Sequence, residues 1–172
     1  WFTYFPEDYR WSAAIGGMLG LAVVGASDMG EIDRTARKLK NKLGDDEAWF
    51  FTWQELGDEL KQKADDCRNR GHTISASVFY LRASCYYQWG ERFRTVKDDH
   101  ALNVYRKSVE CFHEHAQLSM SPKIEIVEVP YEGNFLPGYF VHAENTKKSK
   151  NPTMIFFDGL DITKELQYAR GV

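Results

Sequence analysis

The hydrophobic positions in the first two thirds of the chain repeat with the spacing of α-helices. This pattern predicts four amphipathic helices, over residues 32–43, 53–67, 74–93 and 102–116. The third helix carries a second apolar face, formed by Ala76, Tyr80, Ala83 and Tyr87. A helix that is apolar on two faces is expected to lie buried between its neighbours.

Polar and glycine residues mark the ends of the predicted helices. Asp28 stands three residues before Glu31, a spacing typical of a capping box at the start of a helix. Gly71 is expected to end the second helix, and Thr73 to cap the third. The two helices that flank Gly71 therefore form an antiparallel helical hairpin.

The pattern changes at Ser121-Pro122, where strand-forming residues begin. Residues 123–131 and 135–143 predict two strands joined by a turn at Glu132-Gly133-Asn134. Residues 153–157 are continuously apolar, which predicts a third strand buried on both faces. After the turn at Asp158-Gly159, a short helix is expected to begin near Lys164.

These elements divide the chain into two predicted parts. Residues 1–120 form a helical domain, and residues 121–172 form a second part in which three strands precede a helix. A hairpin, one buried strand and one helix do not complete a sheet, so we expect the chain to be the front part of a larger protein.

Composition narrows the class of protein. Hydrophobic residues make up 43% and charged residues 27% of the 172 residues, as is typical of a folded globular domain. The formal net charge of −3 gives no indication of a nucleic-acid partner. The aromatic content of 15% favours a binding cavity or a subunit interface.

Two further features bear on the cellular environment. The cysteines Cys67, Cys85 and Cys111 form no CxxC pair, and an odd number cannot close a disulfide framework, so free thiols in the cytoplasm are expected. The apolar run over residues 13–26 is shorter than a membrane-spanning helix requires, so no membrane partner is expected.

The second part of the chain resembles the start of an α/β-hydrolase core. The resemblance rests on the hairpin sequence over 127–139 (VEVPYEG followed by LPGY) and on DGLDITKE over 158–165. The first part adds matches in the same order along the chain: Gly30-Glu31, Gly44-Asp45, Trp49, Trp53, residues 80–84 and Tyr86-Tyr87. Together they are similar to the branch that contains 2,6-dihydroxypseudooxynicotine hydrolase, fungal pigment-pathway hydrolases that shorten polyketides, and fermentation–respiration switch proteins.

The resemblance implies a Ser-His-Asp mechanism with an oxyanion hole. The serine elbow G-x-S-x-G does not occur in this sequence, and the acid and histidine would follow the serine, so the triad is not contained in this chain. The resemblance does imply one oxyanion-hole donor, the backbone N–H of Leu160, with Gly159 shaping the turn and Asp161 as a neighbour or alternative donor. Asp158 departs from the His or Gly of many hydrolases, and an ordinary turn is the other interpretation.

The resemblance also implies that the helical domain covers the active site. Five aromatic residues could then line an apolar cavity, although aromatics at helical spacing are usually part of the core: Tyr80, Tyr86, Tyr87, Trp89 and Phe93. His113 and His115 are two residues apart on a predicted helix, so they face different directions and do not form a metal-binding pair. No cofactor or metal is expected.

The functional hypothesis is hydrolysis of a carbonyl C–C bond in an aromatic ketone or polyketide, through an acyl-enzyme. An ester hydrolase or acyltransferase of the same fold is the near alternative. An alternative of another class is a helical interaction module without catalysis. The expected partners are the small-molecule substrate, the remainder of the hydrolase chain and a second copy in a homodimer.

Overall fold

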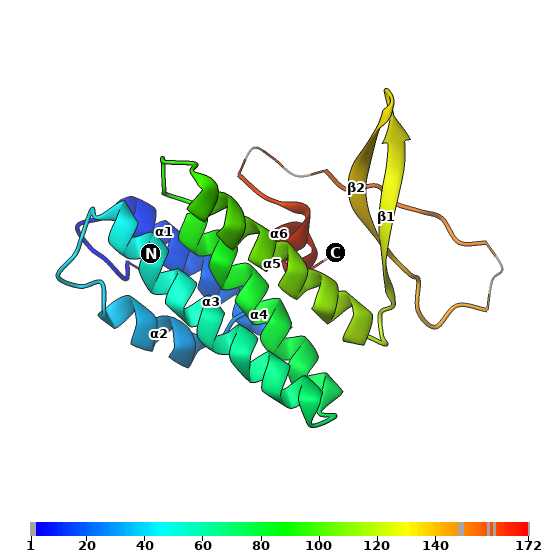
Figure 1. Ribbon diagram of the computed structural model, residues 1–172, viewed down its shortest axis with the longest axis horizontal. Coiled ribbons are helices and arrows are strands. Elements are labelled where there is room, and N and C mark those ends of the chain that lie inside the picture. The colour runs from blue at the N-terminus through cyan, green and yellow to red at the C-terminus, as the bar shows by residue number, and fades with distance from the viewer. Residues whose placement is uncertain (1–2, 148–149, 158, 160, 172) are drawn as a thin grey trace.

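A computed structural model describes residues 3–147, 150–157, 159 and 161–171. A helical bundle lies beside a two-stranded hairpin, and a short last helix lies against the bundle (Figure 1). The elements in chain order are α1 (Tyr9–Gly20), the 3₁₀ helix η1 (Leu21–Val24), α2 (Met29–Arg37), α3 (Asp46–Asn69), α4 (Thr73–Glu91), α5 (Asp99–Leu118), β1 (Ile124–Tyr131), β2 (Asn134–Val141) and α6 (Lys164–Ala169).

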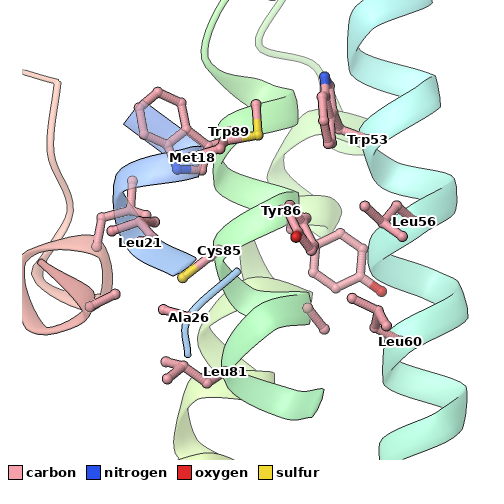
Figure 2. Close-up of a cluster of buried hydrophobic side chains, with 14 of the residues drawn as sticks. Met18, Leu21, Ala26, Trp53, Leu56, Leu60, Leu81, Cys85, Tyr86 and Trp89 are labelled. Atoms are coloured by element: carbon pink, nitrogen blue, oxygen red, sulfur yellow. The ribbon is translucent and has the colours of Figure 1, made fainter. Parts of the chain in front are cut away.

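Helix α4 occupies the centre of the bundle, as its two apolar faces predict. It packs against α3 on one side and α5 on another. Figure 2 shows Tyr86 directed toward Leu56 and Leu60 of α3, while Trp89 lies near Met18 of α1. All of these side chains are buried. Removing this apolar surface from water is the main force that holds the helices together.

Indole rings form the other part of the core. Trp11, Trp49 and Trp53 are fully buried and contact one another in sequence, with ring centroids 4.9 and 5.4 Å apart. The indole nitrogen of Trp49 donates a hydrogen bond of 2.9 Å to the carbonyl of Trp89. This bond satisfies a buried donor and joins α3 to the end of α4.

The helix starts agree only in part with the predicted caps. The Asp28 side chain accepts from the N–H groups of Gly30 and Glu31, at 2.8 and 3.1 Å. Glu31 does not complete the box, because the Asp28 N–H donates to the Tyr86 hydroxyl oxygen at 2.9 Å and Glu31 pairs with Arg82. The prediction that Thr73 is a cap is wrong: it is the first residue of α4 and makes no capping bond there.

Two helices have bounds that differ from the predicted ones. The helix expected over 32–43 ends at Arg37, because the next residues bond three positions back, as Leu39 N–H does to the Ala36 carbonyl at 3.0 Å. Leu39 is nevertheless fully buried, so the apolar spacing still serves the core. Helix α3 begins at Asp46, before the first residue of the apolar pattern at Trp53, because Asp45 caps it by accepting a hydrogen bond from the Ala48 N–H at 2.9 Å.

The predicted hairpin is confirmed. β1 and β2 are antiparallel, and Ile124 pairs with Val141 at the open end. The loop residues Glu132 and Gly133 both have positive φ angles, 48° and 77°, as a tight two-residue turn requires. Most of the apolar side chains of the hairpin are exposed, including Phe135 at 61%.

The predicted third strand is wrong for the described structure. Residues 153–157 have no regular secondary structure, and Phe157 is 89% exposed. A strand needs a hydrogen-bonded neighbour, and the strands in the described residues pair only with each other. The apolar run over 13–26 forms most of α1 and η1. Among the described residues, no helix combines the length and apolar character that a membrane crossing needs.

Candidate functional site

The segment predicted to form half of an oxyanion hole is a turn that leads into α6. Leu160 and Asp158 lie outside the described residues, whereas Gly159 and Asp161 are described. The Gly159 carbonyl accepts from the Ile162 N–H at 3.4 Å. Thr163 then caps α6, because its hydroxyl oxygen accepts from the Leu166 N–H at 3.3 Å. The helix expected near Lys164 is therefore confirmed.

Every second residue from Asp161 to Glu165 contacts a different polar partner. Asp161 contacts Arg92, whose guanidinium nitrogens lie 3.4 Å from its carbonyl oxygen and 3.6 Å from its carboxylate. Thr163 donates its hydroxyl proton to Oε1 of Gln88. Glu165 accepts a hydrogen bond from the Tyr139 hydroxyl. The helical bundle holds the first two residues, and the hairpin holds the third.

Gln88 is itself fixed by the bundle. Its side-chain nitrogen donates to the Ser108 hydroxyl at 3.2 Å, and that hydroxyl donates to the Tyr105 carbonyl at 2.8 Å. Gln88 is buried, so it has little freedom to rotate. The chain of bonds from Tyr105 through Ser108 leaves Oε1 of Gln88 facing Thr163, and it links the start of α6 to α5.

Glu165 is a buried carboxylate with two charge-stabilising partners. Its Oε1 atom accepts from the Tyr139 hydroxyl at 2.6 Å and lies 2.7 Å from the Lys164 ammonium. Burial raises the pKa of Glu165, but hydrogen bonds from Lys164 and Tyr139 outweigh this and bring the pKa below its ordinary value. Burial, with the hydrogen bond to Glu165, raises the pKa of Tyr139 far above its ordinary value. Glu165 is thus an anion, and Tyr139 is a neutral donor.

A pocket of about 290 Å³ lies beside this segment, at the C-terminal end of α4. The Arg92 guanidinium lies 5.3 Å from the centroid of the Trp89 ring, so a charged and an aromatic group meet at the pocket. The lining residues are Gln88, Trp89, Glu91, Arg92, Lys97, Asp161, Ile162, Thr163 and Leu166. The pocket therefore lies between the end of α4, the loop that leads to α5, and the predicted oxyanion turn.

Most aromatics that could have lined a cavity belong to the core. Tyr80, Tyr86 and Tyr87 are buried, and their hydroxyls contact carboxylates of neighbouring helices. Phe93 is partly buried and packs against Trp49, with centroids 5.3 Å apart. Of the five aromatics considered, only Trp89 lines the pocket of the candidate site.

A buried serine–histidine pair occurs elsewhere in the bundle. The Ser77 hydroxyl lies 2.9 Å from Nδ1 of His115, but that nitrogen is also 3.1 Å from the Ser77 carbonyl. Both residues are buried, and Nε2 of His115 has no hydrogen-bond partner among the described residues. Burial lowers the pKa of His115. In the described part of the chain this pair lacks both an acid partner and access to the pocket, so it joins α4 to α5 as a structural contact.

Sequence reasoning identified the turn but missed the residues that hold it. Gln88 and Arg92 carry no motif, and helical spacing alone does not indicate that they face a turn about 70 residues later. Tyr139 and Glu165 occur within the motifs of the resemblance, but their contact follows only from the fold. The described residues contain no cluster of three or more metal-ligating side chains.

Comparison with known proteins identifies the class of protein that this arrangement resembles. In a solved structure, that of a 2,6-dihydroxy-pseudo-oxynicotine hydrolase, 70% of this chain superimposes on 32% of the other chain, with a TM-score of 0.55 and 22% identity. The shared fold is a helical domain followed by the first strands of an incomplete α/β-hydrolase. No protein-family model matches the chain.

Curated relatives carry the same class name. The chain is 27% identical to the hydrolase acrC of Aspergillus aculeatus, over 99% of this chain and 42% of that protein. It is 26% identical to the α/β hydrolase ucsC of Acremonium sp., over 97% and 37%, and 27% identical to the α/β hydrolase psoB of Aspergillus fumigatus, over 88% and 35%. The chain thus spans less than half the length of these relatives, and the predicted resemblance to α/β-hydrolases of this branch is confirmed.

Proposed function

We propose that this chain is part of a serine-type α/β-hydrolase, to which it contributes the helical domain over the active site and one oxyanion-hole donor. The backbone N–H of Leu160 is the proposed donor, with Gly159 shaping the turn and Asp161 as a neighbour or alternative. The observation that carries this proposal is the placement of the turn beside the pocket, where Arg92 and Gln88 hold the residues that follow it.

The proposed reaction begins with attack by a serine outside this chain on the substrate carbonyl carbon. The carbonyl oxygen becomes an oxyanion, which the Leu160 N–H and a second donor would stabilise. The C–C bond then breaks, its electron pair leaves with the carbon leaving group, and that group is protonated. Water attacks the remaining acyl-enzyme and releases the acid. One such donor contributes about 2.7–4 kcal/mol to the transition state.

The proposed substrate is a ketone on an aromatic or polyketide skeleton. The exposed Arg92 guanidinium at the pocket supports a flat, partly polar ligand, because a guanidinium can stack on a conjugated ring. The name of the solved relative, a hydrolase of a dihydroxy-pseudo-oxynicotine, supports the same class. An ester hydrolase or an acyltransferase uses the same acyl-enzyme and is the near alternative.

Two broader features of the whole protein are part of the proposal. The resemblance supports a homodimer formed through the helical domain. All three cysteines, which are among the described residues, are free thiols, and this supports a cytoplasmic location.

A serine-directed probe tests the proposal. The complete protein that carries this chain is treated with a fluorophosphonate and its intact mass is measured. We expect one covalent adduct on one serine, with loss of turnover of a β-diketone or an aryl ester. The ratio of the two activities separates C–C from ester cleavage. The absence of an adduct, together with no cleavage of either substrate, would contradict the proposal that the protein is a serine hydrolase.

Expression of these 172 residues alone addresses the interaction-module alternative. A non-catalytic module would be stable and monodisperse in this form. The exposed apolar side chains of the hairpin and of residues 154–157 instead favour a surface that a larger core covers. We therefore expect this fragment, expressed by itself, to aggregate.

A further inference from the structure

Tyr139 lies where β2, α5 and α6 meet. Its hydroxyl donates to Oε1 of Glu165 at 2.6 Å and lies 3.2 Å from Nε2 of His113 on α5. Its ring packs on Phe112 with centroids 4.5 Å apart, and the Lys164 ammonium lies 5.2 Å from the ring centroid. One side chain of the hairpin therefore contacts both α5 and the helix that follows Gly159.

Glu165 is buried more deeply than its place in the helix requires. A glutamate in the first turn favours the helix dipole equally well when it is solvated. Here the residue is only 1% exposed, and burial of a carboxylate is strongly unfavourable unless it is paired. Its partners are Tyr139 and Lys164, and it also interacts electrostatically with Tyr105 and His113 of α5 and with Cys85 of α4. The unfavourable burial of the Glu165 carboxylate therefore occurs at the contact between the hairpin and α6.

The contact lies close to the proposed donor along the chain. Glu165 follows Gly159 by six residues, and the intervening Thr163 is tied to Gln88. The Gln88 contact fixes the start of α6, whereas the Tyr139 contact fixes its rotation about that point. A misplacement of about 1 Å in a reacting group can reduce a rate by about 100-fold, so the rotation of α6 matters for a donor in the adjoining turn.

We propose that Tyr139 and Glu165 are positioning residues, whose hydrogen bond holds α6, and through it the turn at Gly159, in the position that the proposed oxyanion hole requires. This inference rests on the proposed hydrolase function. It assigns to the hairpin an indirect role in the reaction, since Tyr139 acts through Glu165 and not through contact with substrate.

The test uses the complete protein with Tyr139→Phe and Glu165→Leu. Tyr139→Phe removes one hydroxyl and keeps the ring that packs on Phe112. Glu165→Leu removes one partner of a buried ion pair, so the melting temperature should fall. Because Lys164 is partly exposed and the Tyr139 hydroxyl keeps its contact with His113, the variant should still unfold cooperatively. We expect kcat to fall about tenfold in each variant with KM within about twofold, and the double variant to be no worse than the more severe single one.

Two exposed residues of the same hairpin provide matched controls. Tyr131→Phe and Glu128→Leu make the same chemical changes on side chains that are exposed in the described residues, and they should leave kcat unchanged. If Tyr139→Phe and Glu165→Leu keep kcat within about twofold while the wild type is active, the positioning role is overturned and the hydrolase proposal stands. Loss of cooperative unfolding in both variants would also overturn it, since the contact would then be structural. A wild type without turnover or a fluorophosphonate adduct overturns both proposals.

Discussion

Gly57 of α3 lies directly against the ring of Tyr87 on α4. A Cβ atom added at position 57 would be 2.5 Å from Cε1 of that ring, well inside van der Waals contact. The ring is held in place, because its hydroxyl donates to Oδ1 of Asp58 at 2.7 Å. The close approach of α3 and α4 therefore depends on the missing side chain at position 57.

Gly57→Ala is expected to destabilise the protein. Alanine favours a helix by about 1 kcal/mol over glycine, but insertion of a methyl group into a packed core costs about 1–3 kcal/mol. The second effect should exceed the first, because the Tyr87 ring cannot move without losing its bond to Asp58. The free energy of unfolding, measured by urea denaturation, should fall.

Gly16→Ala is the matched control for this prediction. Gly16 also lies within a helix, but it is exposed, and a Cβ atom added there would have no neighbouring atom of the described residues within 4 Å. Helix propensity alone then predicts that Gly16→Ala raises the free energy of unfolding by about 0.5–1 kcal/mol. Equal effects of the two substitutions would show that the contact between Gly57 and Tyr87 carries no steric strain.

The ion pairs of Glu59 should make the free energy of unfolding depend on pH. Hydrogen bonds from Arg34 and Lys63 lower the pKa of Glu59 from 4.5 to about 2. Because the folded-state pKa lies below the unfolded one, this stabilisation is full above pH 4.5 and is lost as the pH falls toward 2. The pair is partly exposed, so Glu59→Gln should cost no more than about 1 kcal/mol at neutral pH.

The measurement is the difference in unfolding free energy between wild type and Glu59→Gln as a function of pH. The difference should shrink to nothing at the acid end of the range. In an Arg34→Gln background it should be smaller at every pH, because one partner of the carboxylate is gone. A difference that grows as the pH falls would contradict the assignment.

The cysteines should differ in reactivity. Burial raises the pKa of the Cys85 and Cys111 thiols to about 12, whereas Cys67 is partly exposed. At about pH 8 the native protein should therefore react with a thiol reagent at Cys67 first, as mass spectrometry of labelled peptides would record. In a Cys67→Ser variant, rapid labelling of either of the other cysteines without denaturant would contradict the burial of α4 and α5.

The bond between Gln88 and Thr163 predicts the local stability of α6. Gln88→Met keeps the length of the side chain and removes both hydrogen bonds of the amide. If the local stability of α6 falls by about 1 kcal/mol, backbone amide exchange in Lys164–Ala169 should be about fivefold faster. Gln62→Met, on an exposed face of α3, should leave that exchange unchanged. If exchange in α6 is equal in the two variants, Gln88 does not hold the helix.

Local periodicity in the sequence predicted several features of the fold. The two apolar faces of α4 placed it between neighbours, and Glu132-Gly133 placed the hairpin turn, because both are decided by spacing over a few residues. The helix near Lys164 was predicted with Asp161 or Thr163 as its cap, and the structure shows that Thr163 is the cap. The class of fold was predicted from the resemblance, since an apolar hairpin alone fits many α/β proteins.

Other features depend on partners distant in the chain. Residues 153–157 have the composition of a buried strand but pair with no strand in the described residues, so composition alone gave the wrong answer. The partners Arg92 and Gln88 of the turn are set by how α4 packs, which no pattern near Gly159 records. Glu31 matched a capping box, yet long-range contacts with Arg82 and Tyr86 replaced the local bond.

Removal of a single backbone donor tests the central proposal most directly. Leu160→Pro deletes the N–H proposed to stabilise the oxyanion, and Leu160→Ala changes the side chain while it keeps that N–H. In the complete protein we predict a fall in kcat of about 100- to 1,000-fold for Leu160→Pro and little change for Leu160→Ala, with similar KM values. A Leu160→Pro enzyme that turns over at the rate of Leu160→Ala would contradict the assignment of this turn to the oxyanion hole.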